Sequence, residues 1–156
     1  MDSIHEFLME KYDRLNGGEA TPEEIRDMVN ELLEMAKRDE RDFKGHYVVL
    51  VKHMLKYIYQ KNRQGSSWIK SIRNSHSYLA DLVEDASLVK KVLPLLDMFY
   101  QKARREASGE TRLSIQVFPE KCPIEWSLKN LTDYAFIDNF LVDNVSTEEA
   151  KKYLCL

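Results

Sequence analysis

The chain is poor in the residues that build turn-rich or cross-linked folds. Five glycines and four prolines in 156 residues favour long regular elements over turn-rich β structure. Two cysteines, Cys122 and Cys155, are too few for a disulfide framework or a zinc cluster, so we expect free thiols in a reducing cytoplasm. The chain also lacks a run of about 18 apolar residues, and its first six residues do not resemble a signal peptide. We therefore expect a cytoplasmic protein with no membrane partner, no cofactor and no bound metal.

Acidic residues are missing from one continuous quarter of the chain, between Phe43 and Ala80. We call residues 44–80 the basic segment. It contains seven basic residues: Lys44, Lys52, Lys56, Lys61, Arg63, Lys70 and Arg73. The rest of the chain holds the other 16 basic residues and all 26 acidic residues, so its charge is near −10 while that of the basic segment is near +7. This asymmetry indicates an anionic partner or an acidic surface within the same protein.

Apolar residues recur at the spacing of an α-helix along most of the chain. Such stripes cover residues 4–15, 25–43, 47–58, 69–86 and 88–103. Thr21 followed by Pro22 is a typical helix start, and the charged stretch before Gly45 predicts a break or kink there. Pro94 lies inside the last stripe, where it predicts a kink or a late helix start. The sequence therefore predicts an all-α, single-domain helical bundle of four to five main helices over residues 1–131.

The pattern changes after Gly109. Leu113, Ile115 and Val117 alternate with polar residues, which predicts a short extended segment. A proline-containing loop and a short helix over residues 127–131 are expected to follow. Residues 132–156 form a small irregular C-terminal extension in this prediction, and they are too apolar to be disordered. We expect this extension to pack on the bundle or on a second subunit.

Four separated blocks of sequence carry a family resemblance. They are residues 53–60 (HMLKYIYQ), 67–72 (SWIKSI), 100–104 (YQKAR) and 118–123 (FPEKCP). In their order and spacing they resemble the family called domain of unknown function 29, over about residues 20–131, with the tail from Thr132 outside. The resemblance implies a soluble all-helical bundle of a kind common in bacteria, with no established biochemical activity.

Cations and aromatic residues are interleaved in the basic segment. The candidate binding residues are Lys56, Tyr59, Gln60, Lys61, Arg63, Trp68, Lys70 and Arg73. Nucleic-acid binders combine cations that neutralise phosphates with aromatic stacking platforms. Core packing explains the aromatic residues equally well, however, and the pI of about 5.8 is far below that of a dedicated nucleic-acid binder. We therefore expect a non-catalytic interaction or regulatory module. Its expected partner is another protein or a second copy of this chain, and a nucleic acid is the less favoured alternative.

An enzymatic alternative rests on Arg41 and His46, which are separated by four residues. This spacing is similar to the signature of HEPN ribonucleases, which are also helical bundles of this size. In such metal-independent sites Arg and His act on the scissile phosphate and its 2′-hydroxyl, usually across a dimer. Histidine can move a proton near neutral pH and arginine can clamp phosphate. The motif is short and lies outside the four blocks above.

Several further polar residues fall at related helical positions. Glu31 and Asp39 are eight residues apart on one helical face, His53 lies on the next predicted helix and Arg104 on the fifth. We expect these four to form a structural network of hydrogen bonds and ion pairs. A small-molecule or metal pocket is the alternative use of the same residues.

Overall fold

The computed structural model describes residues 3–156, with side chains from Glu6 onward. Helices make up all the regular structure of these residues, and no strand occurs among them, so the all-α prediction is confirmed. The chain divides into an N-terminal unit, Met1–Asp39, and a C-terminal unit, Glu40–Leu156. The predicted domain boundary after residue 131 falls within the last residues of helix α6 (Leu128–Thr132) and stays a prediction.

The N-terminal unit consists of α1 (Ser3–Asn16), a turn and the first part of α2 (Pro22–Tyr59). Thr21 caps α2 as predicted, because its Oγ1 accepts a 3.1 Å hydrogen bond from Glu24 N. Near the turn, Arg14 Nη2 lies 2.8 Å from Glu24 Oε1 and connects the two helices. None of the side chains described between residues 6 and 39 is buried.

Helix α2 is continuous from Pro22 to Tyr59, so the predicted break near Gly45 is wrong. A glycine inside a helix costs about 1 kcal/mol relative to alanine, which is a small penalty. Phe43 and Tyr47 on either side of Gly45 are buried and stack at 6.1 Å between ring centres. Burial of such aromatic side chains outweighs the local preference of one glycine.

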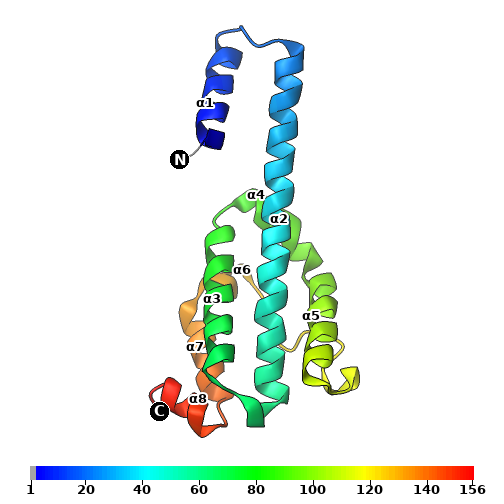
Figure 1. Ribbon diagram of the computed structural model, residues 1–156, viewed down its shortest axis with the longest axis vertical. Helices are drawn as coiled ribbons and strands as arrows, with labels where there is room; N and C mark the ends of the chain where they lie inside the picture. The colour runs from blue at the N-terminus through cyan, green and yellow to red at the C-terminus, as the bar shows by residue number, and fades with distance from the viewer. Residues whose placement is uncertain (1–2) are drawn as a thin grey trace. The chain divides into compact units, whose positions relative to one another are not determined.

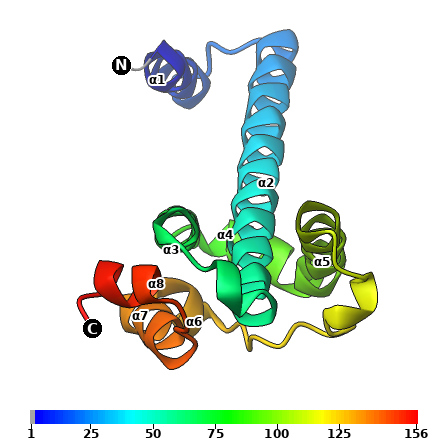
Figure 2. The same ribbon diagram turned by 60° about the horizontal axis from the view of Figure 1, so that its bottom comes forward.

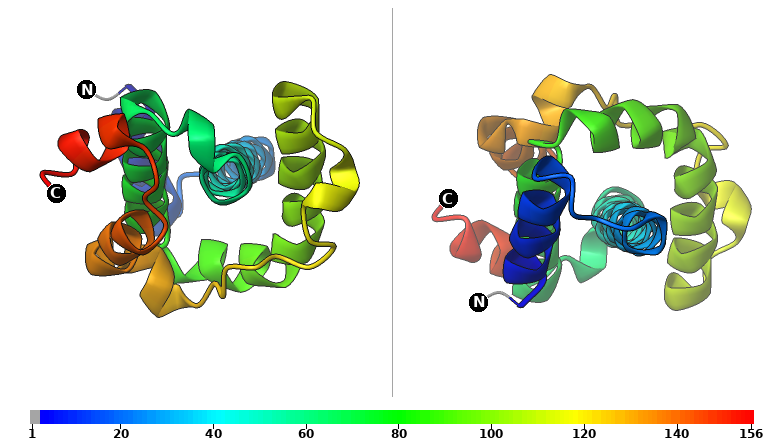
Figure 3. Two further views of the ribbon diagram at one scale, coloured as in Figure 1. Left: turned by 90° about the horizontal axis from the view of Figure 1, so that it is seen from below. Right: turned by 90° about the horizontal axis from the view of Figure 1, so that it is seen from above.

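In the C-terminal unit, α2 lies between α3 (Ser66–Leu82) and α5 (Leu96–Thr111). Figure 3 shows α2 end-on, with these two helices on opposite sides of it. Helix α4 (Ala86–Val92) and the 3₁₀ turn η2 (Leu93–Leu95) connect α3 to α5 and close a third side. Pro94 lies in η2, where it interrupts the helix as predicted.

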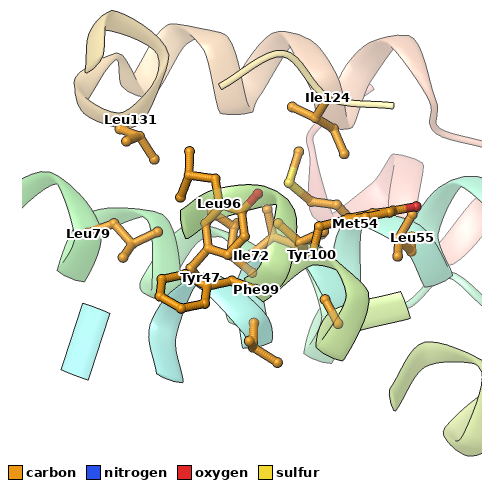
Figure 4. Close-up of a cluster of buried hydrophobic side chains, with 14 of the residues drawn as sticks. Tyr47, Met54, Leu55, Ile72, Leu79, Leu96, Phe99, Tyr100, Ile124 and Leu131 are labelled. Atoms are coloured by element: carbon orange, nitrogen blue, oxygen red, sulfur yellow. The ribbon is translucent and has the colours of Figure 1, made fainter. Parts of the chain in front are cut away.

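The core of the C-terminal unit gathers around the apolar stripe of α2. Figure 4 shows Tyr47, Met54 and Leu55 of this helix among side chains from α3 and α5. Fully buried members of the cluster on α2, α3 and α5 include Leu50, Val51, Ile69, Ile72, Leu79 and Ala103. Burying one such large aliphatic side chain contributes about 1.5–3 kcal/mol, which is why the most apolar predicted stripe is the central one.

The segment after α5 differs from its prediction. Residues Ile115–Val117 form a 3₁₀ turn, η3, and the expected extended segment is absent. Ser114 starts this turn, because its side chain accepts a hydrogen bond from Gln116 N. Ile115 and Val117 are both exposed, so their alternation does not mark one buried face of a strand.

The C-terminal extension is helical and more regular than predicted. It contains α7 (Tyr134–Asp143) and α8 (Glu148–Tyr153). Both helices, with α6 before them, contact α3, as Figures 1 and 2 show. The buried Tyr57 hydroxyl of α2 donates a 2.8 Å hydrogen bond to the carbonyl of Leu141 on α7. None of the described helices has the length and apolar character needed to cross a bilayer.

Candidate functional site

The basic segment lies entirely within the C-terminal unit. It covers the second half of α2, the 3₁₀ turn η1 (Lys61–Arg63) and most of α3. The seven basic residues differ in how their charges are met. Three of them contact acidic side chains and a fourth lies over an aromatic ring. The last three have no acidic partner among the described residues.

Lys52 and Lys56 of α2 form an ionic cluster with two glutamates of α5. Lys52 Nζ lies 3.2 Å from Glu106 Oε1 and 2.9 Å from Glu110 Oε2. Lys56 Nζ lies 2.6 Å from Glu110 Oε1, and the two lysine side chains are only 12% and 9% exposed. Both pairs have i, i+4 spacing, so neighbouring lysines on one helix meet neighbouring glutamates on the other. The cluster neutralises two of the seven positive charges inside the protein.

The contacts of this cluster favour the charged forms of Glu110 and Lys52. Burial alone would raise the pKa of Glu110, but the hydrogen bonds that it accepts from Lys56 and Lys52 lower the pKa below its ordinary value. Burial alone would lower the pKa of Lys52, and its bonds to Glu110 and Glu106 outweigh this and raise the pKa. Both shifts favour the charged pair at neutral pH.

The aromatic residues of the basic segment take part in internal packing. Lys56 Nζ lies 5.8 Å from the centre of the half-buried Trp68 ring, so this cation occupies one face of the indole. Tyr59 packs edge-on against Phe118, with 5.7 Å between ring centres. Gln60 is half-buried just after the end of α2. Neither Trp68 nor Tyr59 is therefore a free stacking platform.

Lys61, Arg63 and Lys70 are exposed, and we call them the basic corner. Lys61 and Arg63 lie in η1, and Lys70 lies in the second turn of α3. Arg73, one turn further along α3, is also exposed, but its Nη2 lies 3.3 Å from Asp138 Oδ1 on α7. Lys44 Nζ lies 5.8 Å from the centre of the buried Phe99 ring. The basic corner is therefore the part of the basic segment whose side chains form no ion pair among the described residues. One carboxylate reaches the same turn, where Glu149 Oε1 accepts a 3.5 Å hydrogen bond from Ser66 N.

Buried Gln64 anchors the backbone of the basic corner. Its Nε2 donates to the carbonyl oxygens of Tyr57 and Asn144, each at 2.8 Å. Its Oε1 accepts a 2.7 Å bond from Ser146 N, and its backbone oxygen accepts a 2.9 Å bond from Thr147 Oγ1. These bonds tie the turn between α2 and α3 to the loop between α7 and α8. Sequence reasoning missed this residue, because several of its partners lie 80 or more positions away.

Arg41 and His46 are both on α2, but five residues place their side chains about 140° apart around the helix. The His46 ring stacks on Tyr78 of α3, with 4.4 Å between ring centres and 7° between their planes. Tyr78 also lines a hollow of about 440 Å³ on α3, formed with Asn74, Ser77 and Asp81. Arg41 is exposed. A ribonuclease site built from Arg41 and His46 stays a prediction.

The predicted polar network is divided between the two units. In the C-terminal unit, His53 Nδ1 donates a 2.8 Å hydrogen bond to Val49 O, one turn earlier on α2. Arg104 Nε donates to Phe118 O at 3.0 Å and so holds the loop after η3. Glu31 and Asp39 belong to the N-terminal unit, where Glu31 is exposed. The network of all four residues stays a prediction.

A separate hollow of about 430 Å³ is lined by Tyr47, Cys122 and Trp126, among others. Burial raises the pKa of the Tyr47 hydroxyl and of the Cys122 thiol, so neither is ionised near neutral pH. Because the thiolate is the reactive form of cysteine, this hollow offers no ready nucleophile. Over the part of the chain that the structure describes, no three potential metal ligands of the His, Cys, Asp or Glu type come together.

The fold and the site together define an all-α protein whose basic segment carries three exposed cations that have no acidic partner among the described residues. The chain belongs to the family described as Domain of unknown function DUF29, whose model matches residues 2–137. The match confirms the resemblance and extends it at both ends, where it includes residues 132–137 of the tail that was expected to lie outside and leaves residues 138–156 unmatched. No curated protein and no solved structure matches the chain at a significant level. The family carries no assigned activity, so function must be argued from the residues themselves.

Proposed function

We propose that this protein is a non-catalytic interaction module whose basic corner binds an anionic partner. One observation carries the proposal. Of the seven basic residues in a segment without acids, four are engaged within the C-terminal unit, while Lys61, Arg63 and Lys70 have no acidic partner among the described residues. The positive charge that remains is concentrated at one turn and the helix that follows it.

The basic corner is better suited to recognition than to stability. Exposed single charges contribute little to the free energy of unfolding, about 0–1 kcal/mol even when paired. Uncompensated charges of one sign attract oppositely charged partners over roughly one Debye length, about 8–10 Å at physiological salt. Gln64 adds rigidity, because its buried hydrogen bonds hold the backbone between Arg63 and α3 in place. A preorganised surface loses less entropy when it binds.

An acidic protein surface fits the basic corner better than a single-stranded nucleic acid does. Proteins that bind single strands stack bases on open aromatic rings. Trp68 and Tyr59 are the aromatic residues nearest the basic corner in sequence, and both are engaged in internal contacts. The overall formal charge of −3 also disfavours general attraction to nucleic acids.

The test compares two triple variants in a salt series. The first variant changes the basic corner, Lys61, Arg63 and Lys70, to Gln. The second variant changes three other exposed lysines to Gln: Lys90, Lys102 and Lys129. Labelled poly-glutamate and single-stranded RNA serve as acidic and nucleic-acid probes, read by fluorescence anisotropy. We expect poly-glutamate binding that weakens as salt rises and that is lost in the first variant only.

Equal loss of binding in both triple variants would refute the proposal, since general charge would then explain the binding. Stronger binding to RNA than to poly-glutamate would show that the anionic partner is a nucleic acid and not an acidic protein surface. Cleavage of the RNA probe that disappears in His46→Ala would instead establish the ribonuclease alternative that uses Arg41 and His46.

A further inference from the structure

The N-terminal unit exposes an unusual number of large apolar side chains. They are 38–58% exposed and comprise Met9, Tyr12, Leu15, Ile25, Val29, Leu32 and Leu33. Ile25, Val29 and Leu32 have i, i+4, i+7 spacing, so they line one face of α2. Tyr12 and Leu15 of α1 have i, i+3 spacing and share a face in the same way. Both helices therefore carry an apolar stripe of the kind that helices bury against other helices.

This unit has few other means of stabilising itself. It spans 39 residues, and a unit of about this size usually needs a disulfide, a metal or oligomerisation to fold stably. Both cysteines of the chain lie outside it, and its described residues contain no cluster of metal ligands. None of its side chains described from residue 6 onward is buried. An apolar partner is the remaining source of stability.

We infer that the N-terminal unit pairs with the N-terminal unit of a second copy of this chain. A large apolar residue presents roughly 150–250 Å² when fully exposed, so the seven exposed portions amount to roughly 600 Å² per copy. Two copies would bury roughly 1,200 Å², which reaches the lower end of stable protein interfaces. Two helices from each copy make four, the number that packs around a shared core in a four-helix bundle.

A symmetric pairing also explains why the apolar face needs no partner of different sequence. In a twofold dimer the same patch is used by both subunits, so each stripe meets an equally apolar surface. The unit carries 11 acidic and 5 basic residues, a formal charge of −6, and two copies therefore repel each other. Salt screens this repulsion and leaves apolar contacts intact, so the dimer becomes tighter as salt rises. The basic corner lies outside the N-terminal unit, and this inference does not depend on the proposed function.

Sedimentation velocity of the full chain over about 1–100 µM, at low and moderate salt, measures the pairing directly. We expect a monomer–dimer equilibrium whose dissociation constant falls as salt is raised. The disruptive variant changes Val29 and Leu32 to Gln, which is polar, uncharged and a good helix former. The control is Met98→Gln on α5, because Met98 is at least as exposed, at 59% against 48% for Val29 and 52% for Leu32, but lies in the C-terminal unit.

The variant should weaken dimerisation by roughly 100-fold or more, because each substitution occurs twice in a symmetric interface. Met98→Gln should leave the dissociation constant unchanged. A wild-type chain that stays monomeric at 100 µM and moderate salt would overturn the inference. So would equal weakening by the variant and the control.

Cross-linking of a mixture of isotopically heavy and light chains keeps the inference testable even if the variant folds poorly. Lys11 and Lys37 both lie in the N-terminal unit. We expect heavy–light cross-links that join these two positions between copies. Cross-links from Lys11 of α1 that are confined to one chain and reach the C-terminal unit would show that the apolar stripes are covered within the monomer, and would refute the pairing.

Discussion

Glu110→Gln removes the carboxylate that bridges Lys52 and Lys56, whose side chains are only 12% and 9% exposed. Lys56 has no other acidic partner among the described residues, and Lys52 keeps only Glu106. The substitution preserves the size and the helix propensity of the side chain, so its effect reports the lost charge. We expect the C-terminal unit to become less stable while its fold is maintained.

The size of the effect follows from burial. Breaking a fully buried ion pair costs about 3–5 kcal/mol, because the remaining charge is left without compensation. The Glu110 side chain is 44% exposed, so water screens part of the loss. The expected decrease in the free energy of unfolding is therefore about 1–2 kcal/mol. For a domain of this size it corresponds to a decrease in Tm of roughly 3–6 °C.

Thermal unfolding followed by circular dichroism measures this decrease. Glu148→Gln is the control, since the Glu148 side chain is 93% exposed and its pair with Lys151 should contribute less than about 0.5 kcal/mol. Adding Lys56→Met to Glu110→Gln should restore most of the stability, because the uncompensated cation is then removed. A Tm unchanged by Glu110→Gln, or a further loss on adding Lys56→Met, would refute the reasoning.

The same pair predicts an acid-dependent loss of stability. The pKa of Glu110 is lowered in the folded state, so its contribution is present above the unfolded pKa of about 4.5 and is lost as the pH falls through the folded value. Below pH 4.5 the wild-type protein should lose stability faster than Glu110→Gln, which has no carboxyl group to protonate at this position. Parallel pH profiles of Tm for the two proteins would contradict this.

Three further predictions concern other buried groups. Burial lowers the pKa of His76, although Asp133 and Asp138 nearby act to raise it. The stability that neutral His76 contributes is therefore complete above the unfolded pKa of 6.5 and declines as the pH falls below it. In His76→Gln this part of the pH profile of stability should flatten. Gln64→Ala should cost about 2–4 kcal/mol in denaturant unfolding, because four backbone groups lose their hydrogen bonds to this buried side chain. Cys122 should react with iodoacetamide at least about tenfold more slowly than exposed Cys155, as peptide mass spectrometry would show.

The sequence predicted the fold well where one helix face is buried and poorly where a single residue decides. The stripe that begins at Tyr47 marked the central helix, because burial imposes the 3.6-residue period directly. The break predicted near Gly45 was wrong, because the low helix propensity of one glycine is outweighed by the burial of the aromatic residues around it. The extended segment predicted from Ile115 and Val117 was wrong, because apolar and polar residues can also alternate by chance in an exposed turn.

The candidate site shows the same division. The i, i+4 spacing of Lys52 with Lys56 and of Glu106 with Glu110 is visible in the sequence, but Glu23, Asp27 and Glu31 have the same spacing, so the packing of α2 against α5 selects the pairs. No local pattern could have identified Gln64, because its role depends on a loop that is distant in the chain.

The two proposed surfaces respond to salt in opposite directions, and this makes them separable in one preparation. Binding at Lys61, Arg63 and Lys70 is an attraction between unlike charges, so added salt weakens it. Pairing of two N-terminal units joins apolar faces against like charge, so added salt strengthens it. If the anionic partner were instead the acidic N-terminal unit of the second copy, dimerisation would weaken with salt and would require the basic corner. The sign of the salt dependence of dimerisation therefore decides which surface holds the two copies together.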